Sequence, residues 1–146
     1  MLKRYTFWLT AAIIFLFINT IFHTASLFIS LPASNDTERQ LLELLSTYKF
    51  DLGAGFHPTF GNMFLALSSC FSFVCLLGGL TLGYLLLKGI GADIMKGIIG
   101  INVLVFGGIF VVMVVFTFIV PIVLSGLIFI NLLMAFIMIR GAREMA

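Results

Sequence analysis

Charged residues are scarce in this sequence. Only 10% of the 146 residues are Asp, Glu, Lys or Arg, whereas 62% are hydrophobic. An average soluble domain carries roughly a quarter charged residues, so a water-soluble fold of this length has too little polar surface to enclose so much apolar material. The net charge is only +2, which excludes the extended basic face that nucleic-acid binding requires. The composition therefore indicates an integral membrane protein.

Catalytic and metal-binding signatures are also missing. The chain has two cysteines and two histidines, and it contains no CxxC, HExxH, GxSxG or P-loop pattern. Cys70 and Cys75 share one apolar run, and their spacing would separate them by about 140° around a helix. This geometry disfavours a disulfide, and we interpret both as small packing residues. The sequence therefore identifies no catalytic residue, no metal site and no cofactor.

Long apolar stretches dominate the chain. About 20 apolar residues cross a bilayer as a helix, and we predict spans at about residues 5–31, 59–87, 97–117 and 122–139. The last two divide an uncharged run that would make one helix of about 64 Å, so we expect a hairpin that breaks near Pro121. The first stretch exceeds the roughly 7–15 residues of a signal-peptide core, which favours an uncleaved span. The expected fold is an all-α, four-helix transmembrane bundle.

The one sizeable polar region lies between the first two predicted spans. Leucines and a tyrosine recur there at helical spacing, and Asn35 followed by Glu38 resembles a capping box. We therefore predict a short amphipathic helix at about residues 36–48, which lies either on the membrane or on the ends of the spans. Because the turn at residues 118–121 has almost no polar character, we expect this helix to cover it. Pro58 is expected in the first turn of the second span.

Cationic residues are distributed unequally between the two sides of the predicted spans. The positive-inside rule places the richer side in the cytoplasm, and an even number of spans then places both termini there. The amphipathic helix is accordingly expected outside the cytoplasm. Six cations lie on the richer side, Lys3, Arg4, Lys88, Lys96, Arg140 and Arg143, and two lie on the other, Arg39 and Lys49.

A polar stripe occupies the late part of the first span. Asn19, His23 and Ser26 are four and three residues apart, so they share one helix face. Polar groups within a membrane are costly and often functional, and one interpretation is a site for a lipid headgroup, a quinone or a metal. The other is hydrogen bonding between helices. His57 and Asn62, near the start of the second span, extend this candidate network; His57 either joins His23 as a metal or haem ligand or caps the second span.

Small residues recur in the second and third spans at spacings that let membrane helices approach closely. We interpret them as helix-packing positions, either within the bundle or against a partner, and we expect Asn102 and Asn131 to bridge helices. The small residues are Ser68, Ser72, Cys75, Gly79 and Gly83 in the second span, and Gly97, Gly100, Gly107 and Gly108 in the third.

Four short motifs follow one another along the chain: His23-Thr24, residues 39–45, residues 50–53 and residues 59–61. In this arrangement the sequence resembles a family of small bacterial four-span membrane proteins with no assigned function. The resemblance covers most of the chain and implies no catalytic role. It also implies a bacterial inner membrane. Members typically have Gly-His-Thr in the first span, where this chain has phenylalanine before His23.

Three functions are compatible with these patterns. The first is a non-catalytic accessory or assembly subunit of a larger membrane complex, with other membrane subunits or further copies of itself as partners. The second is a protein that binds a small molecule, a lipid or a quinone through the His23 region. The third is a small oligomeric transporter or channel with a water path past Asn19, His23 and Asn102. An enzyme is less favoured, because no acidic residue lies within the predicted spans.

Overall fold

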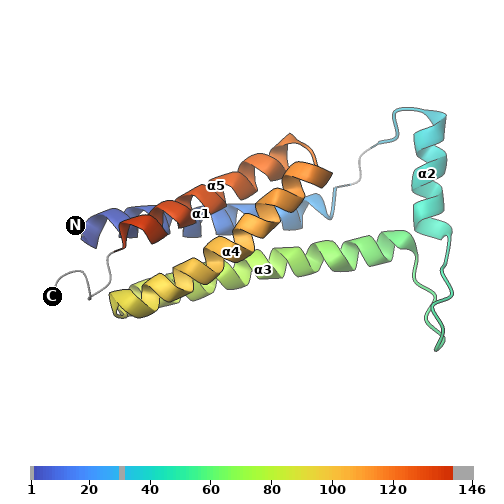
Figure 1. Cartoon of the computed structure of the whole chain (residues 1–146). Coiled ribbons are helices and arrows are strands. Elements are labelled where there is room, and N and C mark those ends of the chain that lie inside the picture. The colour runs from blue at the N-terminus through green and yellow to red at the C-terminus, as the bar shows by residue number, and fades with distance from the viewer. Residues whose placement is uncertain (1, 30–31, 140–146) are drawn as a thin grey trace. The chain divides into compact units, whose positions relative to one another are not determined.

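The computed structural model describes residues 2–29 and 32–139, with the side chains described from Tyr5 onward. Four of the helices in this part of the chain are long and apolar enough to cross a membrane. The protein is therefore an all-α integral membrane protein. The helices, shown in Figure 1, are α1 (Leu2–Ser26), α2 (Asp36–Thr47), α3 (Phe60–Lys88), α4 (Ala92–Phe116) and α5 (Ile119–Met138).

The four spans are found, but several of their ends differ from the prediction. Helix α1 ends at Ser26, five residues before the predicted end. Helix α4 begins at Ala92 instead of residue 97. This earlier start places Asp93 in the first turn of α4, where a carboxylate interacts favourably with the helix dipole. The loop between α3 and α4 therefore shrinks to residues 89–91, with Gly89 at a positive φ of 62°.

The break between the last two spans is not at Pro121. Phe118 is the N-cap of α5, and Pro121 is the third residue of that helix. Proline is tolerated in the first turn, because an N–H there has no partner within the helix. Phe118 and Ile119 are each more than two-thirds exposed among the described residues. Because apolar side chains can face lipid, the turn before Pro121 does not need a cover of protein.

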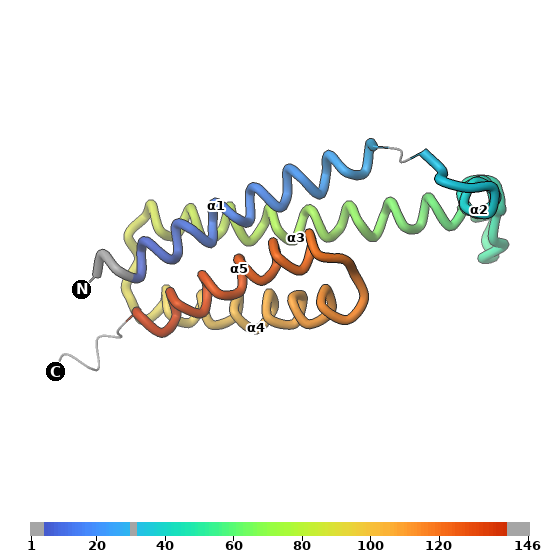
Figure 2. Tube along the Cα trace, turned by 90° about the horizontal axis from the view of Figure 1, so that it is seen from above, coloured from blue at the N-terminus to red at the C-terminus, as the bar shows by residue number. Residues whose placement is uncertain are grey.

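The chain forms two compact units, and α1 and α3 each run through both of them. Unit 1 consists of the residues up to Thr20 and from Val74 onward, and unit 2 is Ile21–Phe73. In unit 1, α3 contacts α1 at Gly79 and α4 at Gly78. Helices α4 and α5 form the closest helix pair and lie side by side in both views (Figures 1 and 2).

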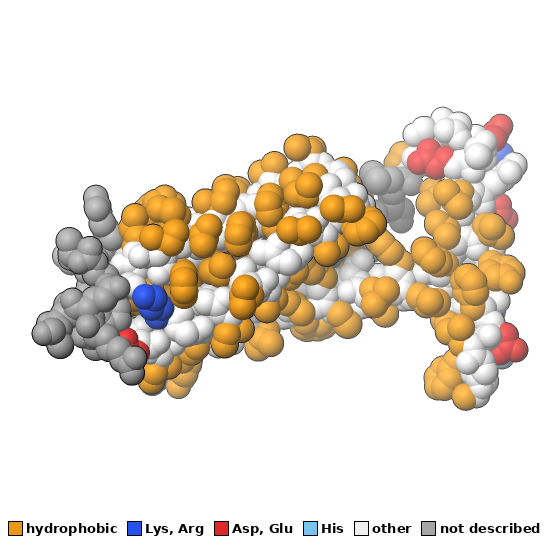
Figure 3. Space-filling view, viewed as in Figure 1, with side chains coloured by type: hydrophobic (Ala, Val, Ile, Leu, Met, Phe, Trp, Pro, Cys, Tyr) orange, Lys and Arg blue, Asp and Glu red, His pale blue; other side chains and the backbone are white. Residues whose placement is uncertain are grey.

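Large apolar side chains fill the interior of unit 1, and its surface is apolar as well. Leu104 and Phe116 are nearly four-fifths exposed, and hydrophobic side chains cover most of the face seen in Figure 3. An apolar surface of this extent is the one that contacts lipid in a membrane. The fully buried side chains include Leu9, Leu16, Leu82, Ile99, Phe106, Ile128 and Leu132.

Unit 2 contains α2, whose start is fixed by a reciprocal cap. The backbone N–H of Glu38 donates to Asn35 Oδ1 at 2.9 Å, and the Glu38 carboxylate accepts from the backbone N–H of Ser34 at 2.6 Å. In an ordinary capping box the second bond goes to the N-cap residue itself; here it goes one residue earlier. Helix α2 lies within one residue of the predicted range 36–48.

Residues 49–59 form a hydrogen-bonded hairpin rather than an irregular loop. Lys49 and Thr59 form an antiparallel bridge, and the N–H of Phe50 donates to the carbonyl of Pro58 at 3.0 Å. The tip, residues 53–55, has three consecutive positive φ angles, which glycine adopts readily. Pro58 therefore precedes α3, which begins at Phe60, instead of lying in its first turn, and its carbonyl belongs to the hairpin.

Candidate functional site

The polar stripe of α1 contributes a direct contact between two helices. The side-chain amide of Asn19 donates to the sulfur of Cys75 on α3 at 3.2 Å. Both residues are buried, and Cys75 has no exposed surface. Thiol sulfur is a weak acceptor, but in a membrane an unpaired amide has few alternatives. The predicted stripe is therefore used for interhelical hydrogen bonding at this position.

His23 lies closer to the end of α1 than the sequence predicts. Because the helix ends at Ser26, His23 is three residues, or about 4.5 Å, from that end, instead of the eight residues of the longer predicted span. Its half-buried ring meets the Phe71 ring edge-on, with 5.0 Å between the centroids. Ser26 donates to the carbonyl of His23 at 2.7 Å. The contacts that the structure gives His23 and Ser26 are thus the ring contact of His23 with Phe71 and the hydrogen bond between the two residues.

His57 belongs to the hairpin and does not cap α3. The cap is Thr59, whose hydroxyl accepts from the N–H of Asn62 at 3.2 Å. Thr59 is buried, whereas His57 is exposed and places Nδ1 3.9 Å from a carboxylate oxygen of Asp51. Threonine is a preferred N-cap, and a threonine directly before a long apolar run is the signal that identifies this cap from sequence.

The described residues bring no three His, Cys, Asp or Glu side chains together in a way that could hold a metal ion. His23 contacts Phe71, and His57 lies nearest to Asp51. Shared ligation of a metal or haem by the two histidines therefore has no support in the contacts that the structure gives them.

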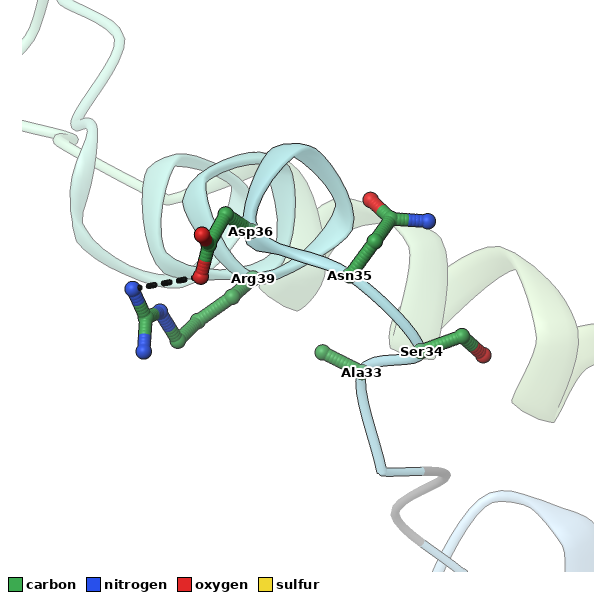
Figure 4. Close-up of a pocket in the computed structure, with 5 residues that line it drawn as sticks. All are labelled: Ala33, Ser34, Asn35, Asp36 and Arg39. Atoms are coloured by element: carbon green, nitrogen blue, oxygen red, sulfur yellow. Dashed lines mark ion pairs between the residues drawn. The ribbon is translucent and has the colours of Figure 1, made fainter.

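A shallow, open depression is present before α2, lined by residues 33–36 and Arg39. Arg39 pairs with Asp36 at 2.9 Å, and both side chains are largely exposed. Figure 4 shows the side chains of Ser34 and Asn35 pointing away from this pair. Exposed ion pairs contribute little to stability, and polar groups that diverge do not make a ligand site.

The small residues of α3 lie against α1 where both helices belong to unit 1. A Cβ on Gly79 would lie 3.4 Å from the ring of Phe17, and one on Gly83 would lie 3.9 Å from Ile13. Ser68 and Ser72 lie further toward the start of α3, in unit 2. Ser72 is buried, and its hydroxyl has no hydrogen-bond partner among the described residues. Ser68 is half-buried.

Glycines on α4 and α5 receive phenyl rings from the opposite helix. A Cβ on Gly107 would lie 3.0 Å from the ring of Phe129, and one on Gly100 would lie 3.1 Å from the ring of Phe136. Gly126 of α5 receives Phe110 of α4 in the same way, at 3.1 Å. The sequence-based set contains Gly100 and Gly107 but omits Gly126, whose signal is the isolated Ser125-Gly126 pair in an otherwise large-residue span.

Two other glycines of α4 point away from the rest of unit 1. Gly97 and Gly108 are exposed, and a Cβ at either position would meet nothing within 4 Å. They alternate with exposed apolar residues at spacings of three and four, which is the repeat of one helix face that packs against another helix. We call this set the outer face of α4: Ile94, Gly97, Ile101, Leu104, Gly108, Val111 and Val115.

Asn102 and Asn131 do not bridge helices through the hydrogen bonds that the structure contains. Asn102 donates to the carbonyl of Ile98 at 2.9 Å, and Asn131 donates to that of Leu127 at 2.7 Å. Both bonds lie within one helix, because an amide side chain reaches the carbonyl four residues earlier. Asn102 and the 2% exposed Phe106 both lie against Gly78 of α3, so the interior near Asn102 is filled by side chains.

Fold and contacts together define the class of this protein: a polytopic α-helical membrane protein whose helices pack through small residues. Comparison with protein-family models, with curated proteins and with solved structures found no match to this chain. The resemblance to small bacterial four-span proteins therefore stays a prediction.

Proposed function

We propose that this protein is a non-catalytic accessory or assembly subunit of a larger membrane complex, and that it binds its partner through the outer face of α4. The observation that carries the proposal is the pair of open glycines, Gly97 and Gly108. Gly100 and Gly107, on the neighbouring side of the same helix that faces α5, each accommodate a phenyl ring. Gly97 and Gly108 offer the same kind of space to a helix from outside the chain.

A glycine on a lipid-facing helix lowers the stability of that helix unless a neighbour packs against it. Glycine in a helix interior is less favourable than alanine by about 0.5–1 kcal/mol. Association of helices in lipid depends on close van der Waals packing, which small residues permit. At Gly107 the close approach of Phe129 offsets this cost within the chain. At Gly108 none of the described residues does so, and a partner helix would supply the missing contact.

The proposal includes a location in a bacterial inner membrane with both termini in the cytoplasm. Four spans put the two ends of the chain on the same side. Lys88 and Lys96 flank the short loop between α3 and α4 on that side. Lys88 lies over the ring of Tyr84 and Lys96 over that of Phe136, an arrangement typical of membrane–water interfaces, where aromatic and cationic side chains gather.

The other two predicted functions have weaker support. Ligand binding at the stripe requires free polar groups, but the amide of Asn19 already donates to Cys75. A channel through a single copy requires space past Asn102, where a ring atom of Phe106 lies 3.2 Å from the Cβ position of Gly78. Both remain alternatives to the proposal.

The test is blue-native electrophoresis with mass spectrometry of mild-detergent extracts from the native membrane. We expect the wild-type protein to migrate with a stoichiometric partner and the Gly108→Phe variant to migrate alone. Val114→Phe is the matched control, because Val114 is also exposed on α4 but lies off the outer face. A wild-type protein that migrates alone contradicts the proposal, as does a partner that Gly108→Phe retains.

A further inference from the structure

The segment formed by α2 and the hairpin, residues 36–58, carries an apolar side that the described residues of unit 2 leave exposed. Leu44 and Tyr48 are each more than half exposed, and so are Leu52 and Phe56 in the hairpin. Leu41, Leu44 and Tyr48 recur at spacings of three and four, which places them on one face of α2. An apolar patch of this kind on a small unit marks a contact with a membrane or a protein.

The connection between α2 and α3 sets the direction in which the apolar side of this segment faces. A Cβ on Gly61, in the first turn of α3, would lie 3.3 Å from the carbonyl oxygen of Leu45. The bridge between Lys49 and Thr59 fixes the hairpin at the same place. Figures 1 and 2 both show α2 lying across the start of α3. Because α3 crosses the membrane, a helix that lies across its end runs along the membrane surface.

Hydrophobic side chains cover much of this segment. Figure 3 shows them over its middle and toward the start of α3, with acidic side chains at its upper end and along its right-hand edge. The exposed rings of Phe60 and Phe64 continue the apolar surface onto the first turns of α3. The lipid-facing surface of a span is thus continuous with the apolar side of α2.

We infer that residues 36–58 lie flat on the bilayer, with Leu41, Leu44, Tyr48 and Phe56 inserted at the boundary between lipid headgroups and acyl chains. The occupant of the apolar side is the lipid surface rather than another protein. Charge attraction to anionic lipid does not drive this contact, because α2 carries Asp36, Glu38 and Glu43 against one cation, Arg39. Apolar burial drives it, so zwitterionic lipid suffices and added salt leaves the contact intact.

Depth-dependent quenching of tryptophan fluorescence tests this inference in the full-length protein. Trp8→Phe removes the single native tryptophan, and Leu44→Trp then reports on the apolar side of α2. Glu43→Trp is the matched control, since the adjacent position is turned by about 100° around the helix, away from the Leu41, Leu44 and Tyr48 side. Both variants are reconstituted in phosphatidylcholine vesicles that contain phosphatidylcholine brominated either near the headgroup or near the chain end.

The expected result is that lipid brominated near the headgroup quenches the tryptophan at position 44 several times more strongly than that at position 43. Lipid brominated near the chain end should quench position 44 less, because the segment lies flat at the boundary. Aqueous iodide should show the reverse preference, with position 43 the more strongly quenched. Leu41→Trp, one turn earlier on the same side, repeats the measurement at an independent position.

Two results would overturn the inference. Equal lipid quenching at positions 43 and 44 would show that α2 stands free of the bilayer. A blue-shifted tryptophan at position 44 without lipid quenching would show that protein covers this side instead. Both readouts are independent of the partner proposed for α4, because they are made on the purified protein in lipid.

Discussion

The two glycine-bearing faces of α4 differ in what they contact. On one face, Gly100 and Gly107 lie against phenyl rings of α5; on the other, a Cβ on Gly97 or Gly108 would meet no atom of the described chain within 4 Å. All four come from one uncharged stretch with the same local composition. The difference shows that a small residue in a membrane helix acquires its role from the shape opposite it, because lipid and apolar side chains are nearly equivalent surroundings.

Substitution of two neighbouring glycines, Gly107 and Gly108, tests most directly whether the two faces of α4 differ. Gly107→Leu forces a side chain into the ring of Phe129, 3.0 Å from the Cβ position, and that ring also stacks on Phe110. Overpacking of this kind costs about 1–3 kcal/mol. We expect a lower melting temperature for the purified protein in mild detergent, measured by circular dichroism.

Gly108→Leu is the control for that experiment. Nothing lies within 4 Å of its Cβ position, and leucine is the better helix former by roughly 0.5–1 kcal/mol. The isolated protein should be as stable as the wild type or slightly more so. Equal destabilisation by the two substitutions would mean that the two faces do not differ.

The second prediction moves from the fold to association. Gly108→Leu should weaken binding to the proposed partner about tenfold, or about 1.4 kcal/mol, because the added side chain keeps the two helices apart. The measurement is the fraction of the protein that co-purifies with the partner at a series of detergent dilutions. Unchanged co-purification would remove the outer face of α4 from the interface.

A smaller effect is expected nearer the start of α4. Gly100→Leu meets one close ring atom of Phe136 at 3.1 Å, with the next at 3.6 Å, so the ring can move aside at a cost near the low end of the overpacking range, about 1 kcal/mol. Gly97→Leu, whose Cβ position is open, serves as its control. Thermal unfolding in detergent compares the two, and a larger loss at position 97 would contradict the assignment of faces.

The smallest effect concerns the polar contact between α1 and α3. Asn19→Ala removes the hydrogen bond to Cys75, and such bonds between membrane helices contribute about 0.6 kcal/mol on average. Thr20→Val is the matched control, because the Thr20 hydroxyl donates only to the carbonyl of Leu16 in its own helix. A loss for Asn19→Ala larger than that for Gly107→Leu would show that polar contacts, not glycine packing, dominate this bundle.

The candidate positions were predictable to different extents. The hydrophobic pattern identified Gly100 and Gly107, since small residues stand out in a run of large ones. It placed His23 too deep, because residues 27–29 after α1 are as apolar as the helix itself and give no sign of its end. It offered His57, and not Thr59, as a possible cap of α3, because the hairpin before α3 depends on hydrogen bonds between its two sides, such as that from Phe50 to Pro58.

By itself, the sequence determined the membrane class, the number of spans and the short amphipathic helix, because each follows from hydrophobicity and its period along the chain. The tertiary structure decided which glycines of α4 pack against a phenyl ring of α5 and which face open space. It also decided that Asn19 contacts Cys75 and that α2 lies across the start of α3. Those features depend on which side chains meet across helices, and in a chain that is apolar on nearly every side, the local pattern does not encode the rotation of one helix against another.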